Sequence, residues 1–137
     1  MKSVELFAGG GGLAIGLERS GFHHSYIVEN NKDACNTLKS NYLKSSGTVI
    51  HHGDIRQFDY SDIASNVKLV SGGPPCQPFS LGGNHKAFND DRDLFPEAVR
   101  AIRELQPDAF IFENVKGLLR SAFADYFDYI ILQLQYP

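Results

Sequence analysis

The sequence has few cysteines, no long apolar run and no repeated or low-complexity segment, and each absence narrows what the chain can be. Its two cysteines, Cys35 and Cys76, form no Cys-x-x-Cys pair, which argues against a zinc site or a disulfide scaffold and leaves room for one reactive thiol. No run approaches the roughly 20 apolar residues that a membrane span requires, and Met1 opens directly into a strand pattern without a signal peptide. We therefore expect a cytoplasmic protein of one domain, over residues 1–137, with no membrane partner.

The chain also lacks an excess of basic residues. Its 13 Lys and Arg stand against 16 Asp and Glu, for a formal net charge of −3. A self-sufficient DNA-binding protein usually presents a basic face, so a role on nucleic acid would need much of the binding surface from elsewhere. The five histidines show no metal-ligand spacing, and we expect no bound metal.

Short apolar runs alternate with helical patterns along the chain. The runs predict five strands, at residues 4–7, 26–29, 48–51, 67–70 and 109–112. Apolar residues at helical spacing predict helices at 13–20, 31–42, 96–105 and 123–135, with a long loop at 71–93. Strands that alternate with helices are typical of βαβ units. The predicted fold class is therefore α/β, with a parallel sheet whose carboxyl-terminal edge holds any ligand.

Three features at the predicted strand ends indicate a nucleoside pocket. Residues 7–13, Phe-Ala-Gly-Gly-Gly-Gly-Leu, lie where the first strand turns into a helix, and glycines there let the backbone approach a ligand. Glu29 follows at a spacing suited to ribose hydroxyls, and Asp54 is placed to accept from the exocyclic amine of adenine. The pattern fits a dinucleotide as well as S-adenosylmethionine, since Gly9, Gly11 and Ala14 also satisfy the dinucleotide spacing.

A candidate nucleophile follows the fourth predicted strand. Residues 71–80 read Ser-Gly-Gly-Pro-Pro-Cys-Gln-Pro-Phe-Ser, and the three prolines stiffen this loop. A thiol held on a rigid loop at a strand end is placed for attack, so Cys76 is the predicted nucleophile. Cys35, which lies at a helical core position, is interpreted as a small buried hydrophobic residue.

The segment at 73–80 resembles the nucleophile motif of the cytosine-5 methyltransferases. Further blocks similar to those of the family occur in the family's order: the cofactor loop at 7–12, Gly-Asp-Ile at 53–55, the block at 91–95 and Glu-Asn-Val at 113–115. The resemblance covers nearly the whole chain, and Pro-Cys-Gln followed by Glu-Asn-Val is a specific combination.

This resemblance implies a Rossmann-like, S-adenosylmethionine-dependent enzyme that methylates C5 of a flipped cytosine in DNA. Cys76 would add to C6 of the base, and Glu113 would serve N3 and the exocyclic amine. Cofactor contacts are implied at Phe7, Ala8, Gly9, Gly12, Glu29, Asn30, Asp54, Ile55, Gly73, Pro75 and Leu94. Substrate contacts are implied at Ser80, Lys86, Arg92 and Asn114, with residues 81–90 forming a loop that closes over the DNA.

Members of this family normally continue beyond the blocks found here. The arginine-containing block, the target-recognition region and the last cofactor block have no counterpart in the sequence. By resemblance the fold is expected to be incomplete, with the fifth strand left as an apolar edge that favours self-association. A complementing polypeptide is expected to carry the target-recognition region, and the chain alone is expected to be inactive. Three alternatives stay open: a tRNA-directed relative, a catalytically silent fragment or partner subunit, and a Rossmann-type oxidoreductase.

Overall fold

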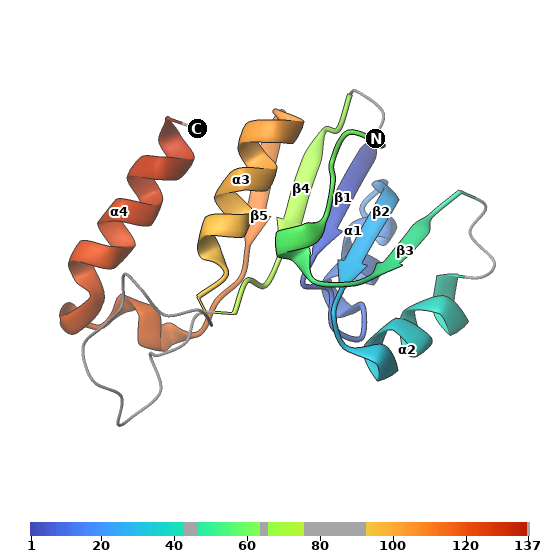
Figure 1. The fold of residues 1–137 in the computed structure, drawn as a ribbon, viewed down its shortest axis with the longest axis horizontal. Coiled ribbons are helices and arrows are strands. Elements are labelled where there is room, and N and C mark those ends of the chain that lie inside the picture. Colours follow the sequence, from blue (N-terminus) through green and yellow to red (C-terminus); the bar gives the residue numbers. More distant parts are fainter. Residues whose placement is uncertain (43–46, 64–65, 76–92, 137) are drawn as a thin grey trace.

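A computed structural model describes residues 1–42, 47–63, 66–75 and 93–136, in which strands and helices alternate (Figure 1). The strands are β1 (Lys2–Leu6), β2 (His23–Glu29), β3 (Val49–His52), β4 (Leu69–Gly72) and β5 (Ala109–Phe112). The α-helices are α1 (Gly12–Arg19), α2 (Lys32–Tyr42), α3 (Phe95–Leu105) and α4 (Ala124–Gln135). Short 3-10 helices cover η1 (Ile55–Gln57), η3 (Lys116–Leu119) and η4 (Ser121–Phe123). The five strands form one parallel sheet in the order β3-β2-β1-β4-β5, which confirms the predicted α/β class.

The chain reverses its direction of travel across the sheet at β1. From β1 it moves outward through β2 to β3, and it then crosses back to place β4 on the other side of β1. In an open parallel sheet such a switch point opens a crevice at the carboxyl ends of the strands, where ligands bind. The two central strands approach closely there: a Cβ on Gly72 would lie 3.1 Å from the carbonyl carbon of Leu6 and closer still to its oxygen. The packing at this point therefore requires a glycine.

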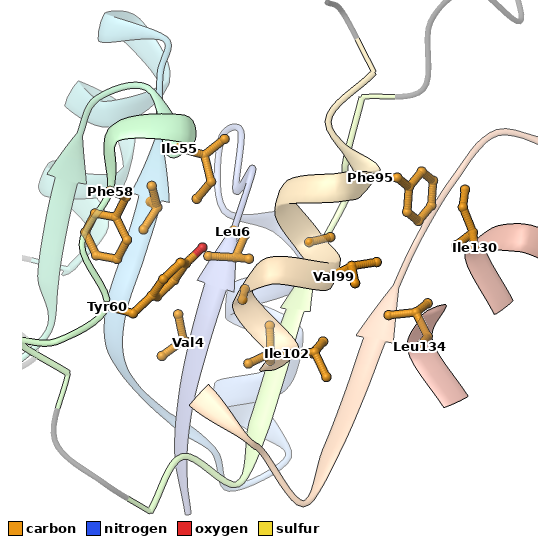
Figure 2. Close-up of a cluster of buried hydrophobic side chains, with 14 of the residues drawn as sticks. Val4, Leu6, Ile55, Phe58, Tyr60, Phe95, Val99, Ile102, Ile130 and Leu134 are labelled. Carbon is orange, nitrogen blue, oxygen red and sulfur yellow. The ribbon is translucent and has the colours of Figure 1, made fainter. Parts of the chain in front are cut away.

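The larger core cluster lies on one face of the sheet, between the strands and α3. The cluster includes Leu6 of β1, Tyr60 of the segment after η1 and Val99 of α3, and it extends to Ile130 and Leu134 of α4 (Figure 2). The sequence of α3 suits this position because its buried residues recur at helical spacing. They are Phe95, Ala98, Val99, Ala101 and Ile102.

The opposite face is covered by α1 and α2. Its smaller apolar cluster joins Ala14 of α1, Ile27 of β2 and Leu38 of α2. His24 is fully buried on this side, and its two ring nitrogens lie 2.9 Å from Ser3 Oγ and 3.0 Å from the Ala14 carbonyl oxygen. Helices on both faces leave the carboxyl-terminal edge of the sheet as the place where loops gather.

Both bounds of β4 differ by two residues from the prediction, because the strand covers residues 69–72 where 67–70 was expected. Backbone pairing decides the difference, because β4 pairs with β1 from Leu69 opposite Ser3 to Gly72 opposite Leu6. Val67 is buried without belonging to the strand. The shift brings the glycine and proline loop directly to the edge of the sheet.

β5 is a terminal strand of the sheet that the structure describes, and it pairs with β4 alone. Its side chains Phe110 and Ile111 are 40% and 46% exposed, and Leu132 of α4 is 52% exposed. A groove lined mainly by apolar residues runs between β5, η3 and α4. The structure thus has the apolar sheet edge that the sequence predicts.

Candidate functional site

An open cleft lies at the carboxyl ends of the four strands β1 to β4. Most of its lining comes from the segments that directly follow these strands, as the switch point predicts. The lining residues are Phe7, Gly9, Val28, Glu29, Asn30, Gly53, Asp54, Ile55, Arg56, Gly73, Pro75 and Leu94. Nine of the eleven predicted cofactor contacts are among them. The other two, Ala8 and Gly12, belong to the same glycine-rich turn as Gly9, and all eleven contacts stay predictions.

The glycine-rich turn after β1 forms one wall of the cleft. Phe7 leaves the strand with a φ of 54°, in the left-handed region that non-glycine residues rarely adopt. The half-buried side chain of Phe7 packs against the main core, which holds the residue in this strained conformation. Gly11 then caps α1 with a φ of 88°. The chain therefore folds back sharply at the sheet edge and leaves Phe7 on the cleft wall.

Glu29, at the end of β2, holds this turn in place. One carboxylate oxygen accepts a hydrogen bond from the N–H of Gly9 at 2.7 Å, and the other accepts from the N–H of Asn31 at 2.7 Å. Hydrogen bonds to a charged acceptor are roughly twice as strong as those between neutral groups, so Glu29 stabilises the shape of the cleft. A carboxylate has about four acceptor sites in all, which leaves room for the predicted contact with ribose hydroxyls.

Asp54 and Arg56 stand together after β3. Asp54 caps η1 by accepting from the N–H of Arg56 at 3.0 Å, and Arg56 Nη2 lies 2.7 Å from the second carboxylate oxygen. These bonds from Arg56 hold the pKa of Asp54 below its ordinary value. Asp54 is therefore an anion that only accepts hydrogen bonds, which suits the predicted amine of adenine. Sequence reasoning did not identify Arg56, since an isolated arginine after Gly-Asp-Ile forms no distinctive pattern.

The segment after β5 lies against the loop after β4. The N–H of Glu113 donates to the Gly72 carbonyl at 3.0 Å, and Asn114 Nδ2 donates to the Pro74 carbonyl at 2.8 Å. A Cβ built on Gly73 would lie 3.5 Å from Glu113 Oε2, which places the carboxyl of Glu113 beside this glycine. The structure therefore brings the predicted catalytic Glu113 to the loop that leads into the predicted nucleophile. Asn114 holds that loop, and its contact with substrate stays a prediction.

Leu94 closes the other side of the same loop, because its N–H donates to the Pro75 carbonyl at 3.1 Å. Residues 76–92 connect these two residues and lie outside the described residues. The expectations for the nucleophile, for the closing loop at 81–90 and for three substrate contacts therefore stay predictions. The residues concerned are Cys76, Ser80, Lys86 and Arg92.

Glu5 is a buried acid that sequence reasoning missed. It is 1% exposed in the middle of β1, and Ser71 Oγ donates to its Oε2 at 3.1 Å. Burial raises the pKa of Glu5 to about 7. His24 Nε2 lies 3.9 Å from the same oxygen, and burial lowers the pKa of this imidazole. The available signal was a single acid within the apolar run Val-Glu-Leu-Phe. Glu5 does not line the cleft, and we interpret it as a structural residue.

The second cysteine has the structural position that the sequence predicts. Cys35 is 1% exposed, and its thiol lies 3.4 Å from the Glu29 carbonyl oxygen as a donor. Among the described residues, no group of three or more His, Cys, Asp or Glu side chains is placed to hold a metal ion. No helix in the described ranges is both long and apolar enough to cross a membrane.

The chain is similar to known DNA methyltransferases. A family model described as C-5 cytosine-specific DNA methylase matches residues 1–136. Type II methyltransferase M.NgoMIV of Neisseria gonorrhoeae is 44% identical over 131 residues, which are 96% of this chain and 41% of the relative. Type II methyltransferase M.PspPI of a Psychrobacter species is 47% identical over 116 residues, which are 84% of this chain and 27% of the relative.

A solved structure supports the same comparison. A proposed DNA modification methyltransferase, encoded within an Escherichia coli prophage, superposes with a TM-score of 0.81 at 27% sequence identity. The match covers 98% of this chain and 38% of the prophage protein. The chain therefore spans less than half the length of each of these three proteins.

Proposed function

Because the chain belongs to the C-5 cytosine-specific DNA methylase family, we propose that it forms the cofactor-binding and catalytic portion of a DNA methyltransferase. The reaction is transfer of a methyl group from S-adenosylmethionine to C5 of cytosine. The proposal concerns a portion of an enzyme, since the chain spans 41% of the Neisseria relative and 27% of the Psychrobacter relative.

The observation that carries the proposal is the meeting of two groups of residues at one edge of the sheet. Nine residues proposed to bind the cofactor line a single cleft. The Glu113 carboxyl lies beside Gly73 of the same cleft, and Pro75, another wall residue, is bonded directly to Cys76. A cofactor site and a catalytic acid at one strand edge, with the proposed nucleophile next in the chain, are what methyl transfer to a base requires.

The side chains of the cleft fit S-adenosylmethionine. Phe7, Ile55 and Leu94 provide apolar surface for the adenine ring, while the carboxylates of Glu29 and Asp54 suit ribose hydroxyls and the adenine amine. The match of residues 1–136 to a methylase family model argues against a dinucleotide and an oxidoreductase. When it is bound, S-adenosylmethionine supplies an electrophilic methyl group.

Cys76 and Glu113 have different proposed roles toward the base, as nucleophile and as proton donor. The thiolate of Cys76 adds to C6 of the cytosine, which breaks the conjugation of the ring and makes C5 nucleophilic. Negative charge develops on N3 during this addition, and the carboxyl of Glu113 donates a proton or a strong hydrogen bond there. Asn114 supports both residues by fixing the loop before Cys76 through the Pro74 carbonyl. C5 would then take the methyl group that S-adenosylmethionine supplies, with S-adenosylhomocysteine as the leaving group, and loss of the C5 proton with elimination would release the Cys76 thiolate.

DNA is the proposed substrate because the family and the named relatives are DNA or type II methyltransferases. A chain with a net charge of −3 needs further basic surface to hold DNA, beyond the proposed contacts of Ser80, Lys86 and Arg92. We propose that a complementing polypeptide carries the target-recognition region. It would cover the exposed edge of β5 and the apolar groove beside α4, which otherwise favour self-association.

Cofactor binding is tested by calorimetric titration of the chain with S-adenosylhomocysteine, beside an Asp54→Ala variant whose thermal melt is checked first. We expect saturable binding that the variant weakens by about tenfold or more, because a charge-assisted hydrogen bond to the ligand is lost. Absence of binding by the folded chain would mean that the described cleft is insufficient to hold the cofactor.

Catalysis is tested by joining the chain to the remaining portion of the Neisseria relative and measuring transfer of radiolabelled methyl groups. We expect transfer to duplex DNA, abolished by Cys76→Ala and strongly slowed by Glu113→Gln, because an amide is a poor proton donor. Transfer to tRNA in place of DNA would overturn the proposed substrate. Full activity of the Cys76→Ala enzyme would overturn the covalent mechanism.

A further inference from the structure

Arg100 of α3 connects the helix to the backbone that follows β3, far from it in sequence. Its Nη2 donates to the carbonyl of Ile55 at 2.7 Å, and its Nη1 donates to the carbonyl of Phe58 at 3.2 Å. Ile55 lines the cleft, whereas Arg100 does not. The guanidinium thus contacts the back of a segment whose front faces the proposed adenine site.

The guanidinium is itself held from several sides. Its Nε donates to Glu97 at 2.8 Å and its Nη1 to Glu104 at 3.1 Å, one turn before and after it on α3. The central carbon lies 4.8 Å from the centre of the Tyr60 ring, in a cation–π arrangement. The side chain is half-buried, at 29% exposure. A planar fork held in this way presents its donors in one orientation.

One peptide group joins Arg100 to Asp54. The carbonyl that accepts from Arg100 and the N–H that donates to Asp54 Oδ1 at 3.0 Å belong to the same peptide, between Ile55 and Arg56. Because a peptide is planar, fixing the direction of its carbonyl also fixes the direction of its N–H. The orientation of the Asp54 carboxylate therefore depends on this peptide, and so on a bond made 45 residues away, as well as on the direct bonds from the Arg56 side chain.

We propose that Arg100 is a positioning residue for the adenine end of the cleft, where it sets the carboxylate of Asp54 to accept from the exocyclic amine of the nucleoside. The inference rests on the proposed function, because it concerns how the same cleft selects adenine. It assigns Arg100 no contact with the cofactor. Its effect is on selectivity for the amine as well as on affinity, which separates it from a purely structural role.

The test compares two ligands on the intact chain by calorimetry. S-Adenosylhomocysteine presents an amine to Asp54, and S-inosylhomocysteine presents a carbonyl oxygen at the same place. We expect the wild-type chain to prefer the adenosyl ligand by at least about tenfold, because in the other complex the Asp54 carboxylate faces a second acceptor in place of a donor. Arg100→Lys keeps the charge and loses the fork, so affinity for the adenosyl ligand should fall about tenfold and the preference should shrink toward unity.

Arg103→Lys is the matched control, because Arg103 lies on the same helix and donates to Gln133 of α4, away from the cleft. It should leave both affinities within about twofold of wild type, as for an exposed contact. Should Arg100→Lys not fold, Glu104→Gln loosens the guanidinium from the exposed side of α3 and should lower the preference in the same direction.

The outcomes separate the inference from the proposed function. If the wild-type chain binds neither ligand, the proposed cofactor site fails, and the inference fails with it. If the wild type binds with the expected preference and Arg100→Lys keeps that preference, the site stands and the inference is overturned. A loss of affinity that is equal for both ligands would also overturn it, since general destabilisation acts on both alike.

Discussion

Replacing Gly72 with alanine would place a methyl group where β1 and β4 come closest. Its Cβ would lie 3.1 Å from the carbonyl carbon and 3.3 Å from the Cβ of Leu6, with the carbonyl oxygen of Leu6 nearer still. Two of these three atoms are backbone, so relief requires the central strands to move apart. The two strands pair over four residues on each side, from Leu69 opposite Ser3 to Gly72 opposite Leu6.

The expected cost follows from this geometry. Forcing one methyl group into a packed interior costs about 1–3 kcal/mol, and a clash with backbone belongs at the upper end of that range. For a chain of this length, each kcal/mol lowers the melting temperature by roughly 3–4 °C. We therefore expect Gly72→Ala to melt about 10 °C below wild type.

Gly73→Ala is the matched control at the next residue. Among the described residues its Cβ would meet only Glu113, at 3.5 Å from Oε2 and 3.9 Å from the carbonyl oxygen, which is ordinary van der Waals contact. Alanine also reduces the entropy of the unfolded chain, so this variant should melt within about 2 °C of wild type or slightly higher. Differential scanning calorimetry measures both variants. Equal melting temperatures for the two would refute the close approach of β1 and β4.

Two further predictions concern stability at different pH and association. Burial raises the pKa of Glu5 from 4.5 to about 7, so the folded chain binds this proton more tightly and loses stability as pH rises from about 4.5 through 7. The Glu5→Gln variant should therefore melt at a higher temperature than wild type at about pH 8, and at no higher a temperature near pH 4.5. The neighbouring His24 is unchanged in the variant, so its own titration affects both proteins. A difference in melting temperature that does not depend on pH would contradict this prediction. Ile111 is 46% exposed on the edge strand β5 of the described sheet. The Ile111→Lys variant should show less self-association in sedimentation velocity, while its melting temperature changes by less than about 3 °C. Unchanged association would mean that the contact between chains lies elsewhere.

Most of the cleft could be predicted because its residues lie directly after strands. Phe7, Glu29 and Asp54 each follow an apolar run, and parallel strands bring their carboxyl ends to one edge. The bounds of β4 were wrong by two residues, because Val67 is buried like a strand residue but has no partner in the sheet. Apolar patterning reports burial, and only backbone pairing reports register.

Residues with distant partners were not predictable in the same way. Glu5 owes its raised pKa to burial, and the hydrogen bond that lowers this pKa comes from Ser71, a residue 66 positions away. Sequence reasoning did not identify Arg100, which binds the carbonyls of Ile55 and Phe58. The residues next to Glu5 and Arg100 in the sequence do not indicate these distant partners.

The sequence by itself determined the fold class, the family and the order of the family's blocks, because these depend on local periodicity and on short runs of specific residues. The tertiary structure decided which of those residues meet. It placed Glu29 on the N–H of Gly9, Asn114 on the carbonyl of Pro74, and Arg100 on the peptide that orients Asp54. Such contacts follow from the order and register of the strands, which local patterns do not encode.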